Sequence, residues 1–213
     1  MEDSLKKYEW RKQDKDLYLP KSKPSIIKVE SMKYLTLVGA GNPNCEPFKT
    51  AVEALYSLSY AIKMIHKKGN PPEGYFDYVV FPLEGVWDLD EEGRKLNYLE
   101  KDHLVYKLMI RQPDFLTEAL FLSIVDDVKK KKPNPMHNKI KFEEIEEGLC
   151  LQMLHIGSYD EEERSFTQMA KYCEENGFTR VDKRHREIYI SDLRKTDPAK
   201  LKTVLRIQVK TDE

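Results

Sequence analysis

The residues best suited to chemistry lie in residues 186–192, whose alternation is typical of a β-strand. Ile188 and Ile190 fall on one side of the period-two pattern, and Glu187 and Tyr189 fall on the other. If the isoleucines pack on a layer of helices, the carboxylate and the phenol line the opposite face of the sheet. A carboxylate beside aromatic rings is suited to holding a cationic or flat aromatic molecule. The alternative is that Glu187 is a solvated residue on the wet side of an antiparallel sheet.

The elements that must position this strand occur twice in the same order. The first set is a strand at 33–38, a helix ending near residue 66, and extended segments at 75–87 and 104–111. The second set is a strand at 149–156, a helix at about 160–176, and strands at 185–191 and 201–209. A further helix is expected at about 115–131, and residues 136–147 read as a polar connector. This order predicts an α+β fold.

Charge and cysteine content narrow the class of protein. The chain has 36 Lys and Arg residues against 37 Asp and Glu residues, a formal net charge of -1, which argues against a nucleic-acid partner. Cys45, Cys150 and Cys173 lack the spacing of a disulfide framework or zinc site. The five histidines and the cysteines show no HExxH, HxH or CxxC spacing, and no GxSxG motif occurs. We therefore expect no metal and no cofactor.

The hydropathy of the chain predicts no association with a membrane. No apolar run approaches the roughly 20 residues that a membrane span needs, and the first residues lack the apolar segment of a signal peptide. A cytoplasmic location is therefore expected. Residues 1–30 carry several large apolar side chains and are expected to form an arm that packs on the domain at 31–213.

Four blocks of the sequence resemble the GyrI-like small-molecule-binding family. The matching blocks are Pro82-Leu83-Glu84-Gly85-Val86-Trp87, Leu108-Met109-Ile110-Arg111-Gln112-Pro113-Asp114-Phe115, His155-Ile156-Gly157-Ser158-Tyr159-Asp160-Glu161-Glu162 and Arg186-Glu187-Ile188-Tyr189-Ile190-Ser191-Asp192. The resemblance implies a pseudo-twofold pair of strand-helix-strand-strand units, with halves at about 31–132 and 148–210. It implies an antiparallel sheet with helices on one face and a ligand cleft on the other.

The resemblance also implies which residues line the cleft. The buried acid at the centre of the family's site matches Glu187, and the family's PLEG-x-W motif matches Glu84 and Trp87. Family members often carry a second aromatic residue where this chain has Asp88. The chain is also similar to a stand-alone subgroup, the cyclopropanoid cyclopropyl hydrolases, because it has an extra helix, an N-terminal arm and no DNA-binding module.

These observations lead to a specific hypothesis for the site. Glu187, with Glu84 as a partner, orients or deprotonates a water molecule that opens a strained cyclopropane ring. The expected aromatic and apolar lining consists of Trp87, Tyr189, Tyr106, Phe81, Tyr78, Met109 and Trp10. For each of these side chains, packing in the core is the alternative role. The alternative function is non-catalytic binding of xenobiotics for sequestration or sensing. The sequence leaves the oligomeric state open.

Overall fold

The computed structural model describes residues 7–69, 71–192 and 195–212. The chain forms two compact units, and each takes its residues from several separate segments. The first unit comprises residues up to Gln13 together with Met32–Leu83 and Leu89–Ile145. The second comprises Asp14–Ser31, Glu84–Asp88 and the chain from Glu146. The short segment Glu84–Asp88 therefore belongs to the second unit, although it lies in the first half of the sequence.

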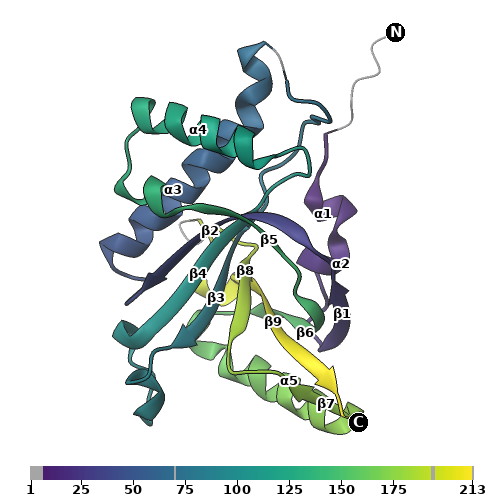
Figure 1. Ribbon diagram of the computed structural model, residues 1–213. Helices are drawn as coiled ribbons and strands as arrows, with labels where there is room; N and C mark the ends of the chain where they lie inside the picture. The colour runs from purple at the N-terminus through teal and green to yellow at the C-terminus, as the bar shows by residue number, and fades with distance from the viewer. Residues whose placement is uncertain (1–6, 70, 193–194, 213) are drawn as a thin grey trace. The chain divides into compact units, whose positions relative to one another are not determined.

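The first unit contains three antiparallel strands in the order β4-β2-β5 (Figure 1). Its α-helices, 3-10 helices (labelled η) and strands are α1 (Trp10–Gln13), β2 (Met32–Ala40), α3 (Glu46–Lys63), η1 (Met64–Lys68), η2 (Gly93–Lys95), η3 (Lys101–His103), β4 (Leu104–Arg111), α4 (Glu118–Lys131), η4 (Pro135–Lys139) and β5 (Lys141–Ile145). Helix α3 begins with a proline in its first turn, where the missing N–H leaves no hydrogen bond unmade. Ala51, Leu55, Leu58 and Ile62 form its buried face.

Strand β5 corrects the expectation of a polar connector at 136–147. Its residues Lys141–Ile145 pair with β2 in the register Phe142 opposite Leu35. The Phe142 ring lies 5.9 Å from that of Phe121 in α4. This strand has exposed positions, and the residues around Phe142 in the sequence are charged. These charged residues hide the alternation of apolar and polar side chains that would indicate a strand.

His137 connects η4 to α3 and provides a pH-dependent contribution to stability. The buried ring lies 2.8 Å from Ser57 Oγ through Nε2. Burial and the charges of Lys129 and Lys132 lower the pKa of His137, so the folded protein keeps the ring neutral. Below about pH 6.5 the unfolded chain takes up a proton that the folded chain does not, so stability falls as the pH falls.

We expect the wild type to lose more unfolding free energy than His137→Gln between about pH 7.5 and 5.5 in urea titrations. Equal losses would contradict this explanation.

The second unit contains the strand order β1-β6-β9-β8-β3, with β7 beside β9, and each of these neighbouring strands pairs in the antiparallel direction (Figure 1). Its helices and strands are α2 (Lys15–Tyr18), β1 (Ser25–Val29), β3 (Leu83–Leu89), β6 (Gly148–Ile156), η5 (Tyr159–Glu161), α5 (Glu163–Asn176), β7 (Phe178–Arg180), β8 (His185–Tyr189), η6 (Pro198–Lys200) and β9 (Lys202–Thr211). The α+β class and the repeated order are therefore confirmed, as β2-α3-β3-β4 and β6-α5-β8-β9. Strands β1 and β7 were not expected.

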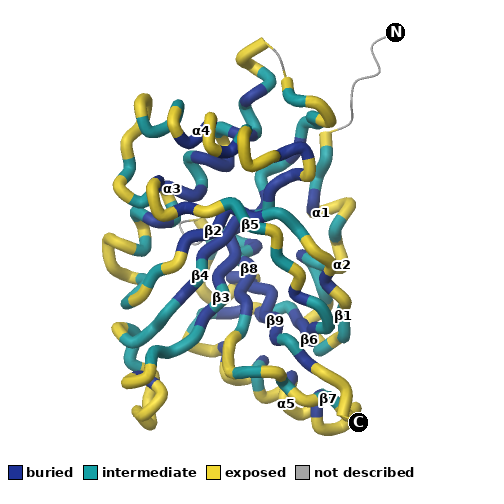
Figure 2. Tube along the Cα trace, viewed as in Figure 1, coloured by how far each residue is buried: buried dark blue, intermediate teal, exposed yellow. Residues whose placement is uncertain are grey.

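Helix α5 packs on the sheet face that carries Glu187. Met169 and Cys173 of α5 form a core cluster with Leu205 and with residues of β6, and Leu205 lies opposite Glu187 in the register of β8 and β9. Residues opposite each other in an antiparallel pair share a face. The expectation that Glu187 lies opposite the helix layer is thus not met in this unit. Figure 2 shows that β8 and β9 are largely buried.

The other face of the same strands carries a buried network of ion pairs. Arg186 Nη1 lies 2.9 Å from Glu84 Oε2, and Arg186 Nε lies 3.2 Å from Glu147 Oε1. Arg206 Nη1 lies 3.0 Å from Glu147 Oε2, and Arg206 also donates to the side chain of Gln152. Two arginines therefore face two glutamates, so the formal charges balance. Such a network needs every partner because an unmatched buried charge is strongly destabilising.

Among the described residues, no helix is long and apolar enough to span a lipid bilayer.

Candidate functional site

Glu187 is held at the centre of β8 by hydrogen bonds to both carboxylate oxygens. The phenol of Tyr189 donates to Oε2 at 2.8 Å, and Nε2 of His185 lies 3.0 Å from Oε1. All three residues share one strand face because they alternate along β8. The Glu187 side chain is 12% exposed, so its carboxylate is fixed in a largely dehydrated environment. Burial and the negative charge of Glu187 raise the pKa of Tyr189, which therefore remains a hydrogen-bond donor.

Trp87 extends this hydrogen-bond chain from the neighbouring strand. Its Nε1 donates to the Tyr189 hydroxyl at 2.8 Å, so the chain runs from indole to phenol to carboxylate. Trp87 lies opposite His185, and Gly85 lies opposite Glu187, in the pairing of β3 with β8. Tyr159 adds a third aromatic ring, in edge contact with Tyr189 at 6.0 Å. The site thus combines a carboxylate with three aromatic side chains.

Gly85 is required for the position of Trp87. A Cβ atom at this residue would lie 2.7 Å from Trp87 Nε1 and 3.3 Å from the Tyr189 hydroxyl. We expect Gly85→Ala to displace the indole, break its hydrogen bond to Tyr189, and lower the unfolding free energy by about 1–3 kcal/mol. The fluorescence of Trp87 can be isolated in a Trp10→Phe background because the chain has two tryptophans. An unchanged emission spectrum with unchanged stability would contradict this role for Gly85.

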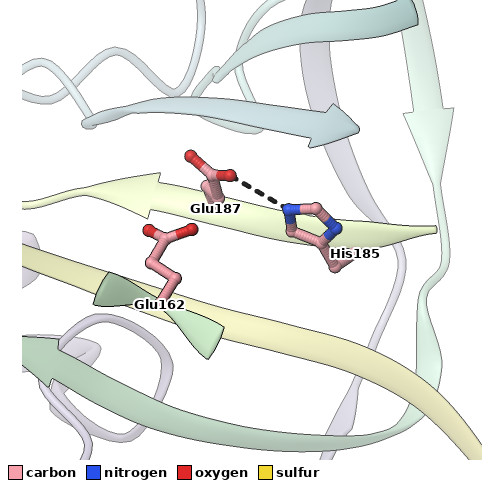
Figure 3. A group of neighbouring side chains, drawn as sticks. All are labelled: Glu162, His185 and Glu187. Carbon is pink, nitrogen blue, oxygen red and sulfur yellow. Dashed lines mark hydrogen bonds and ion pairs between the residues drawn. The ribbon is translucent and has the colours of Figure 1, made fainter. Parts of the chain in front are cut away.

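Glu162 is a second buried carboxylate at this site (Figure 3). It occupies the N-cap position of α5, but its side chain makes no capping hydrogen bond. The carboxylate points toward Glu187 and His185 instead (Figure 3). The residue is 7% exposed, and its Oε1 has no hydrogen-bond partner in the described part of the chain. Burial, with the negative charges of Glu187 and Asp160, raises the pKa of Glu162 to about 9.

Glu162, His185 and Glu187 together have the donor atoms of a metal site. Each offers one ligand atom, and the three atoms lie within 4.8 Å of one another. A histidine nitrogen with two carboxylate oxygens suits several divalent cations. The same residues can also hold a proton or a cationic ligand against the paired carboxylates.

Glu84 does not lie beside Glu187, so the expectation that Glu84 is its partner in the site is wrong. Glu84 is opposite Ile188 in the pairing of β3 with β8, which puts it on the other face of the sheet. There it forms the buried ion pair with Arg186. The carboxylate that accompanies Glu187 is Glu162. Of the residues expected to line the cleft, Trp87 and Tyr189 are the two that the structure brings together with Glu187.

Tyr78, Phe81 and Trp10, which were also expected in the lining, belong to the first unit. Tyr78 and Phe81 are buried with ring centres 6.1 Å apart. Trp10 is buried as well, and its indole donates to the carbonyl of Val80 at 3.1 Å. The Tyr78 hydroxyl is buried without a hydrogen-bond partner among the described residues. These three side chains form part of the aromatic core of their own unit.

Tyr106 and Met109 belong to the first unit too, on opposite faces of β4. Tyr106 lies opposite Gly39, and Met109 lies opposite Thr36 on the other side of the sheet. The Tyr106 ring contacts Phe48 of α3 edge-on at 5.1 Å. Both residues are buried.

The structure identifies three site residues that the sequence reasoning missed. His185 begins the strand that carries Glu187, and the spacing His185-x-Glu187 puts both on one strand face. Tyr159 and Glu162 follow the strand β6 in a loop and helix start, where acidic residues also serve as ordinary helix-terminal charges. Tyr159 and Glu162 are far from Glu187 along the chain, and no motif in the sequence indicated that they lie near it in the fold.

The fold and this arrangement of carboxylates and aromatic rings define a small-molecule-binding domain of the α+β class. Residues 22–210 match the GyrI-like small molecule binding domain, and the chain belongs to this family. Among proteins with curated descriptions, none matches the chain.

Solved structures from Listeria innocua are similar over nearly the whole chain. A protein described as a hydrolase is 36% identical with a TM-score of 0.87, and the match covers 96% of this chain and 100% of that chain. A second, described as an uncharacterized conserved protein, is 37% identical with a TM-score of 0.89 and the same coverage. A third, described as a hydrolase, is 37% identical with a TM-score of 0.88, again with that coverage.

Proposed function

We propose that the protein binds flat aromatic or cationic xenobiotics at the Glu187 site and hydrolyses the cyclopropane ring of DNA-alkylating cyclopropanoid compounds. The observation that carries this proposal is the hydrogen-bonded chain from Trp87 through Tyr189 to Glu187. It fixes a buried carboxylate next to aromatic surfaces, which is the arrangement that such a ligand needs. The family and the relatives named hydrolases support the same function.

Glu187 is the candidate base in this reaction. Each carboxylate oxygen accepts one hydrogen bond from the protein and keeps a lone pair for a water molecule. Glu187 takes a proton from that water while a C–O bond forms to a ring carbon and the strained C–C bond breaks. The released electron pair enters the conjugated system of the ligand, which then takes up a proton, so the net reaction adds water. General-base catalysis typically contributes about 10²- to 10⁴-fold, which suits an electrophile that is already strained.

Aromatic side chains are the candidates for holding the ligand. Stacking on rings such as those of Trp87, Tyr189 and Tyr159 contributes about 0.5–1.5 kcal/mol per ring pair beyond the burial of area. Binding without catalysis is the second candidate function, and the description of the family as a small-molecule-binding domain favours it. In that case Glu187 acts as a fixed counter-charge for a cation.

Incubation with a panel of flat cyclopropanoid electrophiles distinguishes the two functions. Mass spectrometry of the products should reveal addition of one water molecule, with repeated turnover by each protein molecule. In a Trp10→Phe background, ligand should quench the fluorescence of Trp87. Quenching without product even at long times would leave binding as the function. Absence of both product and quenching would contradict the proposed site.

A further inference from the structure

We propose that Glu162, His185 and Glu187 form a binding site for one divalent transition-metal cation. The proposal concerns the metal alone and does not depend on turnover of an organic ligand. Each residue presents one ligand atom, and the three atoms lie within 4.8 Å of one another. Metal–ligand bonds of about 2.0–2.2 Å place neighbouring ligand atoms closer than this limit, so small side-chain rotations bring all three within reach.

The unpartnered oxygen of Glu162 is a second, independent observation that favours a cation site here. Oε1 of Glu162 is buried and has no hydrogen-bond partner among the described residues, although buried polar atoms normally have one. Glu162 is the N-cap residue of α5, but its side chain accepts no hydrogen bond from the backbone N–H groups of the helix. It points instead into the space beside Glu187 and His185 (Figure 3). A bound cation would use this oxygen.

The electrostatics of the site favour a cation. The negative charges of Glu187 and Asp160 both act on Glu162. Two carboxylates that share a buried site require a proton or a cation between them. His185 Nε2 is already directed at Glu187, and a cation at this place would replace that hydrogen bond with two coordinate bonds. A neutral imidazole nitrogen and carboxylate oxygens together suit Zn²⁺ or Mn²⁺.

Surrounding contacts hold the three ligands in place, as the outer contacts of metal sites do. The Tyr189 hydroxyl donates to Glu187 Oε2 and leaves Oε1 directed at His185. The His185 ring packs edge-on against Phe166 of α5 at 4.9 Å, which fixes its orientation. Three protein ligands leave coordination positions open for water, which is the pattern of catalytic rather than structural zinc sites.

Isothermal titration calorimetry with Zn²⁺ and Mn²⁺ tests the proposal on the purified protein after dialysis against a chelator. We expect one ion per chain for at least one metal, with affinity reduced at least about 10-fold in Glu162→Gln and in His185→Gln. The glutamine in Glu162→Gln keeps the size of the side chain, and circular dichroism confirms the fold of each variant. His103→Gln is the matched control because the His103–Asp90 pair is a half-exposed histidine–carboxylate contact elsewhere.

Each result of this titration decides the question. Loss of binding in both site variants and retention in the His103 variant would establish the site. Visible absorption of bound Co²⁺, present in the wild type and absent in Glu162→Gln, would support it independently. No binding of either metal at millimolar concentration would overturn the proposal and leave a proton shared by the two carboxylates. Binding that is unchanged in both site variants would overturn it as well, since the ion would then lie elsewhere.

Discussion

Replacing Glu187 with glutamine is expected to lower the rate of the proposed cyclopropane hydrolysis by about 10²- to 10⁴-fold. The variant keeps the size of the side chain and an oxygen that can accept from Tyr189, but it removes the negative charge and the base. Affinity for neutral flat compounds should stay close to that of the wild type because ring stacking is unaffected. Affinity for cationic aromatic compounds should fall, since the counter-charge is lost. Single-turnover kinetics and fluorescence titration measure the two effects separately.

Glu163→Gln is the control for this experiment. Glu163 is an exposed glutamate in the first turn of α5, so its neutralisation should leave both rate and affinity unchanged. If Glu187→Gln hydrolyses at the wild-type rate, Glu187 is not the base. If it also binds cations with wild-type affinity, the carboxylate has no role in the site.

Replacing Arg206 with methionine is expected to lower the unfolding free energy by about 3–5 kcal/mol. Arg206 is 2% exposed and donates to Glu147, to Gln152 and to the backbone carbonyl of Leu17. Its removal leaves two buried glutamates facing Arg186 alone, so one negative charge is unmatched. This loss is a large fraction of the stability of a typical domain, and urea titration followed by circular dichroism measures it.

Two further variants make this prediction decisive. Arg184→Met removes an exposed ion pair with Asp182 and should change stability by less than about 1 kcal/mol. The double variant Arg206→Met with Glu147→Gln restores the balance of charge and should be more stable than Arg206→Met alone. It also keeps the test informative if the single variant does not fold. A small effect of Arg206→Met, equal to that of Arg184→Met, would show that the network contributes little.

The sequence predicts the long elements of this fold well because their apolar residues repeat with a clear period. Helix α3 and the strands β2, β4, β6, β8 and β9 were all expected close to their observed positions. The short edge strands β1, β5 and β7 were missed, since their pairing partners are distant in the sequence and their own residues are largely polar or half-exposed. Which strand face meets a helix also depends on tertiary packing, and isoleucine alternation alone gave the wrong face for Glu187.

Glu187, Tyr189 and Trp87 were expected at the site from the sequence, the last of them through the motif resemblance. His185 was missed although it lies on the same strand as Glu187. Glu187 and Tyr189 alternate on β8, so their common face follows from the sequence. Glu84 was assigned to the site through the motif resemblance, but the register of β3 against β8 turns it toward Arg186. Glu162 reaches Glu187 through the packing of α5 on the sheet, which no local pattern reveals. His185 and Glu187 alternate on a strand, and this spacing is not one of the HExxH, HxH or CxxC motifs, so those motifs did not indicate His185.

The segment Glu84–Asp88 belongs to the second unit, most of which lies much later in the sequence. During synthesis this segment must therefore wait for its pairing partner. Glu84 and its partner Arg186 are separated by 102 residues along the chain. At a translation rate of about 5–20 residues per second, Glu84 leaves the ribosome about 5 to 20 s before Arg186 does. During that interval the β3 segment lacks the strand β8 with which it pairs. Until β8 has been made, the backbone groups of the β3 segment around Trp87 that pair with β8 in the folded protein have no strand to pair with.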